Sequence, residues 1–272
     1  SSPEYTVRIL PPKISLKEVS FGGAGYYAIK SDDGTIDYTA PHWQDNSNPP
    51  DGDAGDVGDR KYPVCFVSDT AMTAKAKFHI TPAKMLTTIK AKGDEGSFHF
   101  PPTDITINDG KGNIETPDIT CSQIFPNHNV DFFDPMDIKW QLSFDGGITW
   151  QYAGTSSNQV CVTYETPITT TSGALYHTLV YLGCKNAVGQ TTPATITEAI
   201  WNEFTDRYVC RVDGTQLTYY ANYTCTNTTT VQLLQNGDGQ CGAWVGLFLD
   251  MLKIQGINYL NEVIEIEAIS DL

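Results

Sequence analysis

The chain has 272 residues, with 17 basic and 32 acidic side chains and a formal net charge of −15 at pH 7. This length suits two or three domains with a sizeable core, and a composition that is 40% hydrophobic and 11% aromatic excludes bulk disorder. The acidic balance, without any cluster of lysine and arginine, excludes a nucleic-acid-binding protein that works through counterion release.

Residues 1–167 have an all-β texture, because short apolar runs are interrupted by Gly, Pro, Asn and Asp. Short strands with regular turn signals are typical of an Ig-like β-sandwich, here of one or two sub-modules. The polar stretch 31–61 has too little apolar content for a core element and is predicted to be an extended acidic surface loop. The expected strands are 5–10, 26–29, 64–67, 74–80, 86–91 and 138–144.

Four aspartates in this loop, Asp51, Asp53, Asp56 and Asp59, are spaced by two and three residues. Converging carboxylates are the ligands that calcium prefers. The EF-hand pattern is not met, however, because the closing Glu is missing and the glycines fall elsewhere. A solvated acidic turn is therefore the favoured interpretation, and we expect neither a tightly held metal nor a cofactor.

Residues 143–150 match the Asp-box pattern S-x-D-x-G-x-T-W. In proteins that carry this motif, an aspartate in the position of Asp145 ties a β-hairpin turn, and a tryptophan in the position of Trp150 packs beneath it. The Asp-Gly-Gly sequence predicts a hairpin independently. Sialidase-type propellers carry several copies, whereas this chain carries one, so we predict a structural hairpin.

Residues 168–272 are predicted to form a smaller α+β region. Strands are expected at 174–182 and 262–269, and helices at 195–207, 228–235 and 241–255. In the first helix Ile196, Ile200 and Phe204 fall on one face. Gly256 is predicted to end the last helix. The apolar stretch 243–249 is too short to span a membrane and is followed at once by Asp250.

Cys241 is the candidate for chemistry, because it lies in the first turn of a predicted helix. Unsatisfied N–H groups and the positive end of the helix dipole favour a thiolate there. The preceding Asn-Gly-Asp-Gly sequence lets the backbone approach a substrate closely and supplies amides for an oxyanion. The alternative is a buried structural cysteine on an apolar helix face, which is the more common situation.

The run from Gly239 to Trp244, Gly-Gln-Cys-Gly-Ala-Trp, resembles the nucleophile helix of bacterial transglutaminase-like proteins, which are papain-like cysteine enzymes. The segment 199–220 is similar to the helical lead-in of that domain, and the β-region is similar to Ig-like modules attached to it in secreted bacterial proteins. The resemblance covers about residues 172–260. It implies that Cys241 is the nucleophile, that Gln240 lies beside the oxyanion and that Trp244 walls the substrate slot.

The general base of this family follows the cysteine along the chain, but none of the 272 − 241 = 31 residues after Cys241 is a histidine. A papain-like nucleophile needs a base within hydrogen-bond reach. We therefore expect the chain to be the N-terminal, nucleophile-bearing part of such a domain and to be inactive in isolation, with a downstream cleaved fragment or a second chain completing it. The alternative is an extracellular structural, adhesive or filament-forming protein that self-assembles through its β-modules and a remnant cysteine domain.

Seven cysteines without C-x-x-C spacing favour an oxidising compartment, which means an extracellular or cell-surface location. Cys65 and Cys121 are predicted to pair, because they are the only cysteines before residue 150 and both border strands. Three connectivities are open for the four that follow, Cys161, Cys184, Cys210 and Cys225. The resemblance favours Cys184 with Cys225, which leaves Cys161 with Cys210 and Cys241 as the free thiol.

Asn222 and Asn227 fit the acceptor rule for N-glycosylation. The rule is short and is frequently matched by chance. An ordinary polar loop is therefore the favoured interpretation of both positions.

Overall fold

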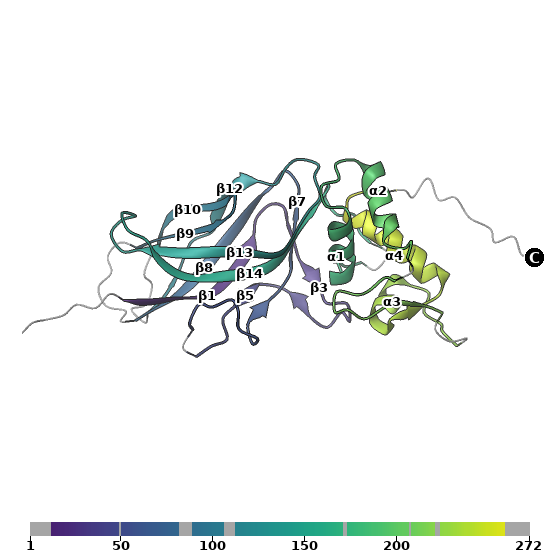
Figure 1. Cartoon of the computed structure of the whole chain (residues 1–272), viewed down its shortest axis with the longest axis horizontal. Helices are drawn as coiled ribbons and strands as arrows, with labels where there is room; N and C mark the ends of the chain where they lie inside the picture. The colour runs from purple at the N-terminus through teal and green to yellow at the C-terminus, as the bar shows by residue number, and fades with distance from the viewer. Residues whose placement is uncertain are drawn as a thin grey trace, which may run out of the picture.

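The computed structural model describes residues 12–48, 50–81, 89–105, 112–170, 173–206, 208–220 and 224–258. Over these residues the protein is mainly β with a small helical part, which confirms the predicted fold class (Figure 1). The strands predicted at 5–10 and 262–269, and the acceptor position Asn222, lie outside the described residues.

The first sheet is built around β8 (Ala71–Thr81), in which every second residue is buried. β8 runs antiparallel to β1 (Lys13–Gly22), and the sheet order is β11-β8-β1-β5-β6, with β12 also pairing with β8. The remaining strands are β5 (Trp43–Gln44), β6 (Arg60–Lys61), β11 (Asn113–Glu115) and β12 (Ile119–Ile124). Because buried and less buried residues alternate along β8, this strand has one face toward a core and one face toward solvent.

The second sheet has the order β10-β9-β13-β14-β7-β2, and β14 pairs with β7 in parallel. Its strands are β2 (Tyr26–Tyr27), β7 (Val64–Val67), β9 (Ile89–Glu95), β10 (Phe98–Ile105), β13 (Asp131–Ser143) and β14 (Gln151–Thr163). The two sheets pack face to face, with the ring centroids of Phe78 and Trp140 6.2 Å apart between them. A small hairpin, β3 (Ile29–Lys30) with β4 (Asp37–Tyr38), projects toward the helices.

The stretch 31–61 is not the wholly exposed loop that its composition predicts. It contains β4, β5 and β6, and both His42 and Trp43 are buried in it. The His42 Nδ1 atom accepts a hydrogen bond of 3.0 Å from the Phe21 N–H, and its Nε2 atom lies 2.8 Å from the Tyr26 hydroxyl. The buried imidazole of His42 and the buried indole of Trp43 therefore anchor this stretch, which its average hydropathy does not predict.

Residues 143–150 form the hairpin between β13 and β14 that the Asp-box motif predicts. The Asp145 carboxylate accepts hydrogen bonds from the N–H groups of Ile148 at 3.0 Å and Thr149 at 2.9 Å. Hydrogen bonds from Thr149 and Ser143 hold the pKa of Asp145 well below its usual range. The Lys92 ammonium lies 5.1 Å from the ring centroid of Trp150, which packs against this turn.

Over the described residues, the helical part contains four helices, whereas the sequence predicts three. They are α1 (His177–Asn186), α2 (Pro193–Asn202), α3 (Thr230–Asn236) and α4 (Cys241–Ile254), with the short parallel pair β15 (Thr218–Tyr219) and β16 (Asp238–Gly239) between them. A capping box of Thr229 and Gln232 starts α3, and Gly256, with φ of +77°, follows α4 as predicted. Among the described residues, no helix is long and apolar enough to cross a membrane.

The predicted strand at 174–182 is wrong, because most of it belongs to α1. The run is rich in residues that favour strands, and α1 is buried on most of its surface between β14 and α4. A helix that is buried nearly all round shows little amphipathic periodicity in its sequence. Its buried residues are Thr178, Leu179, Val180, Leu182, Gly183 and Cys184.

The helices lie at one end of the sandwich, and Gln255 is a main attachment point (Figure 1). Its side-chain oxygen accepts a hydrogen bond of 2.9 Å from the Tyr164 N–H, and its carbonyl oxygen accepts one of 3.2 Å from the Glu165 N–H. Its Nε2 atom donates to the Cys184 Sγ atom at 3.4 Å. The C-terminal end of α4 is thus fixed both to the chain that leaves β14 and to α1.

Candidate active site at the start of helix α4

Cys241 is the first residue of the 14-residue helix α4, and its side chain is exposed. The preceding Gln240 is in an extended conformation and makes no side-chain capping bond to the helix. The Ala243 N–H donates to the Gln240 carbonyl at 3.0 Å, so the N–H groups of Cys241 and Gly242 are those left for a ligand, at the end of the helix where negative charge is stabilised. The exposure separates Cys241 from the buried structural cysteines elsewhere in the chain.

The chain that leads into Cys241 is held on both sides. The Gly239 carbonyl accepts a hydrogen bond of 3.1 Å from the Tyr220 N–H, and the Gln240 N–H donates one of 2.8 Å to the Asn227 carbonyl. A Cβ atom at Gly239 would lie only 2.9 Å from the Cβ of Ala243. Glycine is thus required here for the close approach of the lead-in strand β16 to the helix, which fixes the position of Cys241.

The Gln240 side chain has a different contact from the one that the family resemblance implies. Its Nε2 atom donates a hydrogen bond of 2.6 Å to the Cys225 carbonyl. The amide thereby ties the segment around Cys225 to the start of α4, and only its second N–H remains for a ligand. In this structure Gln240 acts as a positioning residue for the lead-in.

Trp244 lies one helical turn after Cys241 and lines a cavity of about 360 Å³. Phe204 contributes a second aromatic wall, with its ring 6.2 Å from that of Trp244 in an edge-to-face arrangement. The Trp244 Nε1 atom is buried and has no hydrogen-bond partner among the described residues. The other lining residues are Val209, Leu217 and Tyr219. The cavity is therefore apolar, with one indole N–H that has no acceptor.

Large apolar side chains are exposed close to this cavity. Trp201, Tyr208, Tyr219 and Val245 are each more than half exposed. The Trp201 ring packs edge-on against Phe248 of α4 at 5.4 Å. Exposed apolar residues that gather around a pocket are more typical of a contact surface than singly scattered ones.

None of the five histidines forms a contact with Cys241. His177 was the nearest candidate along the chain, but its Nε2 atom lies 2.8 Å from the Gln159 side-chain oxygen and its ring is edge-on to Tyr38. Burial lowers the pKa of His177 to about 4. The other four have their partners in the sandwich or beside it, as His42 with Phe21, His79 with Asn113, His99 with Asp94 and His128 with Glu165.

The cysteine pairings predicted from the sequence are not formed in this structure, in which all seven cysteines are free thiols. Cys65 belongs to the apolar cluster that faces the helices, whereas Cys121 belongs to the cluster between the two sheets. The side chain of Cys184 points to the Val162 carbonyl at 3.6 Å, toward the sheet. The pairs Cys184 with Cys225 and Cys161 with Cys210 are not formed either.

The four aspartates of the acidic loop serve as acceptors within it. Asp51 and Asp53 each accept a hydrogen bond of 2.9 Å from the N–H two residues later. Asp56 accepts from the Ser47 hydroxyl at 3.0 Å, and Asp59 from the Asn46 N–H at 3.2 Å. Over the described residues, no three His, Cys, Asp or Glu side chains are grouped so that they could hold a metal ion.

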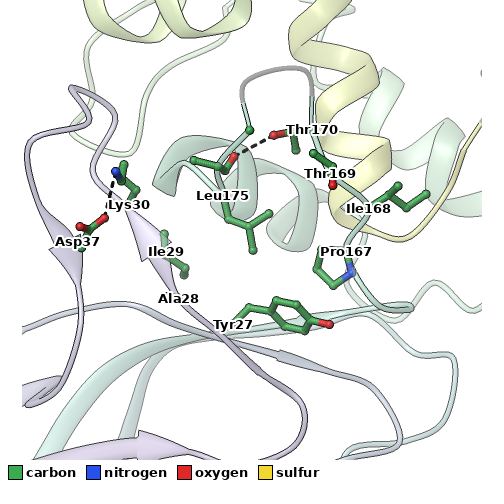
Figure 2. A pocket seen from close by; sticks show the side chains of 12 residues that line it. Tyr27, Ala28, Ile29, Lys30, Asp37, Pro167, Ile168, Thr169, Thr170 and Leu175 are labelled. Atoms are coloured by element: carbon green, nitrogen blue, oxygen red, sulfur yellow. Dashed lines mark hydrogen bonds and ion pairs between the residues drawn. The ribbon is translucent and has the colours of Figure 1, made fainter.

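A second hollow, of about 430 Å³, lies where the small hairpin meets the segment that follows β14. Figure 2 shows Lys30 and Asp37 on one side of it and Ile168 on the other. The Lys30 ammonium and the Asp37 carboxylate are 3.2 Å apart, so the two charges largely satisfy each other. Sequence reasoning missed this hollow, because segments far apart along the chain form it without a shared motif.

Comparisons with protein-family models, with curated proteins and with solved structures found no match. The site must therefore be interpreted from its own geometry. That geometry combines an exposed thiol, an uncapped helix N-terminus and an aromatic cavity one turn away. It offers a nucleophile and donors for an oxyanion, but no histidine base.

Proposed function

We propose that this chain carries the nucleophile half of a cysteine acyltransferase or protease of the transglutaminase-like type, in a secreted or cell-surface bacterial protein. The observation that supports it most is the exposed Cys241 thiol at the uncapped start of α4, one turn from the cavity lined by Trp244. The thiol is accessible to a substrate there, and the free N–H groups beside it can donate to an oxyanion. The cysteine-rich composition supports the extracellular location.

In the proposed reaction, the Cys241 thiolate attacks the carbonyl carbon of an amide and forms a C–S bond. The C–N bond then breaks, and the departing nitrogen takes a proton and leaves as ammonia or an amine. An amine or water attacks the resulting thioester, which releases the acyl group and regenerates the thiol. The N–H groups of Cys241 and Gly242 stabilise the negative oxygen of each tetrahedral intermediate. The cavity beside Trp244 accepts an apolar part of the acyl donor.

The base that moves these protons is not among the histidines of this chain, since each has its partner elsewhere. We propose that a downstream segment or a second chain supplies the base and its orienting carboxylate. General-base help typically contributes 10²–10⁴-fold to the rate. The chain alone is therefore expected to stay at background turnover. With a net charge of −15, nucleic acid is not expected to be the partner.

The test is incorporation of a fluorescent amine into a glutamine-containing peptide, measured for this chain alone and for a longer product of the same reading frame. We expect background rates for the chain alone and turnover for the longer product. Cys241→Ala should abolish that turnover. Gln240→Ala should reduce it less, because Gln240 positions the lead-in without holding the reacting atom. A longer product with downstream His and Asp that shows neither transfer nor hydrolysis would refute the proposal.

A structural or adhesive role is the second candidate, and the exposed aromatic residues around the cavity favour it. In this case copies of the chain would assemble through the helical part. Sedimentation at increasing concentration should then show a self-association that Trp201→Ala weakens. A chain that stays monomeric throughout would remove this candidate.

A further inference from the structure

Three thiols meet where the helices join the sandwich. Cys65 of β7, Cys161 of β14 and Cys184 of α1 are all completely buried, and all belong to the apolar cluster of the helical side. Cys65 and Cys161 are direct partners in the parallel pairing of β7 with β14, so their side chains leave the sheet on the same face. α1 covers this face and brings Cys184 to them.

Cys184 lies against the backbone of β14 next to Cys161. Its Sγ atom lies 3.6 Å from the carbonyl oxygen of Val162, the residue next to Cys161. The Gln255 Nε2 atom contacts the same sulfur at 3.4 Å from the other side and holds it against the sheet. The Cys184 sulfur is therefore held against β14 beside Cys161, and both cysteines belong to the same buried cluster.

Geometry favours this pair over Cys65 with Cys161. Adjacent strands lie about 4.7–4.9 Å apart, and directly paired side chains in a parallel ladder keep roughly that spacing. A disulfide needs Cβ atoms about 3.5–4.5 Å apart and a dihedral angle near 90°. Side chains that converge from a sheet and a helix can meet both conditions by a small movement of the helix.

We propose that Cys161 and Cys184 form a disulfide bond in the oxidised protein, which joins β14 covalently to α1 and leaves Cys65 as a neighbouring thiol. The proposal is independent of the function proposed for Cys241. The bond closes a loop of the chain between residues 161 and 184 and thereby restricts the unfolded state. It assigns a role to two buried thiols that the proposed reaction does not use.

The oxidant is a small-molecule disulfide such as oxidised glutathione. One thiolate attacks the glutathione disulfide and forms a mixed disulfide, which releases one glutathione thiol. The second cysteine then displaces the other glutathione, so that two electrons and two protons pass from the protein to the oxidant. The Cys184 thiol and burial raise the pKa of Cys161, which disfavours its thiolate in the assembled interior. The exchange therefore takes place during folding, before α1 docks.

The experiment refolds the reduced full chain in a buffer of reduced and oxidised glutathione, alkylates the remaining thiols after denaturation, and maps the peptides by mass spectrometry. We expect a linked pair of peptides that contain Cys161 and Cys184, about 2 Da lighter than the reduced pair, and an alkylated Cys65. Complete alkylation of Cys161 and Cys184, or a linkage of Cys65 to either of them, would overturn the proposal.

Stability supplies a second readout. The reductant dithiothreitol should lower the thermal unfolding midpoint of the refolded protein by several degrees. Cys161→Ala and Cys184→Ala should each remove this response, even if either variant is less stable. The matched variant Cys65→Ala, at the partner position of the strand pair, should keep it. A response that persists in Cys184→Ala would contradict the assignment.

Discussion

The Asp32 carboxylate accepts two hydrogen bonds from Thr178, one of 2.9 Å from its backbone N–H and one of 2.6 Å from its hydroxyl. Asp32 follows β3, whereas Thr178 lies in the first turn of α1, so the helix is capped by a residue from a distant segment. The residue before α1, Tyr176, makes no capping bond of its own. The Thr178 hydroxyl also accepts a hydrogen bond of 2.9 Å from the Val212 N–H. The segment around Val212 is thereby also joined to the start of α1.

Asp32→Ala should lower the free energy of unfolding by about 1–2 kcal/mol, the typical cost of losing a helix cap. Urea denaturation followed by circular dichroism measures this. Asp32→Asn is the conservative control and should lose less, because its amide oxygen still accepts one of the two bonds. An Ala variant with an unchanged urea midpoint would show that the cap contributes nothing.

Gly154→Ala should destabilise the protein by about 2–4 kcal/mol. Gly154 has φ of +144°, and a Cβ atom there would lie 2.7 Å from the carbonyl oxygen of Gly52 and from the Cβ of Leu16. The clash with Gly52 involves the backbone of the acidic loop, and a backbone atom cannot move away by a rotamer change. Gly146→Ala is the matched control, because its φ is also positive, at +77°, but nothing lies within 4 Å. Thermal unfolding of both variants should separate crowding from backbone strain.

Acid should destabilise the protein through His42. Burial lowers the pKa of His42 from 6.5 to about 4, so the unfolded chain binds a proton near pH 6.5 that the folded protein does not bind until about pH 4. The stabilisation is thus complete above pH 6.5 and is lost as the pH falls toward 4, by about 2–3 kcal/mol. Protonation of Nδ1 would also break the hydrogen bond that this atom accepts from the Phe21 N–H.

Urea midpoints measured from pH 7.5 to 4.5 test this pH dependence. His42→Gln should flatten part of the decline, whereas His79→Gln, on the outer face of β8, should leave it unchanged. His177 contributes in the same direction, because burial lowers its pKa to about 4 as well. Equal slopes in the wild-type protein and in His42→Gln would contradict the assignment to His42.

Cys241 should react with iodoacetamide at least about tenfold faster than any other cysteine of the native protein, because its thiol is exposed at a helix start. Cys210 is half-buried and should follow slowly, and the five buried thiols should react only after denaturation. Peptide mass spectrometry over time measures the order. Cys241→Ser should remove the fast phase; a fast phase that remains would assign it to another thiol.

Much of the helical part could be predicted from the sequence, because its helices have local start and stop residues. The N-cap threonines before α2 and α3 and the glycine after α4 act within one turn of the chain. α1 could not be predicted in this way, since its cap comes from Asp32 and its buried surface hides the helical period. The position of Trp43 also depends on tertiary packing, which composition does not encode.

The candidate nucleophile could be located from the sequence, because a cysteine after a glycine-rich lead-in has a local pattern. Which cysteines lie close together could not be predicted, since the sheet face that each thiol occupies depends on strand pairing. Cys65 and Cys161 are partners only because β7 and β14 lie side by side in parallel. The cavity beside Trp244 was likewise only partly predictable, because Leu217 and Phe204 reach it from separate segments.

The attachment of Gln255 has a consequence for the thiol at the opposite end of the same helix. α4 spans 14 residues, so Cys241 lies about 20 Å from the end that is fixed to Tyr164 and Glu165. An α-helix transmits displacement along its axis as a rigid rod. A shift of the chain segment after β14 would therefore reach Cys241 as a translation or tilt of the whole helix, and substitutions at the sandwich can alter reactivity without touching the site.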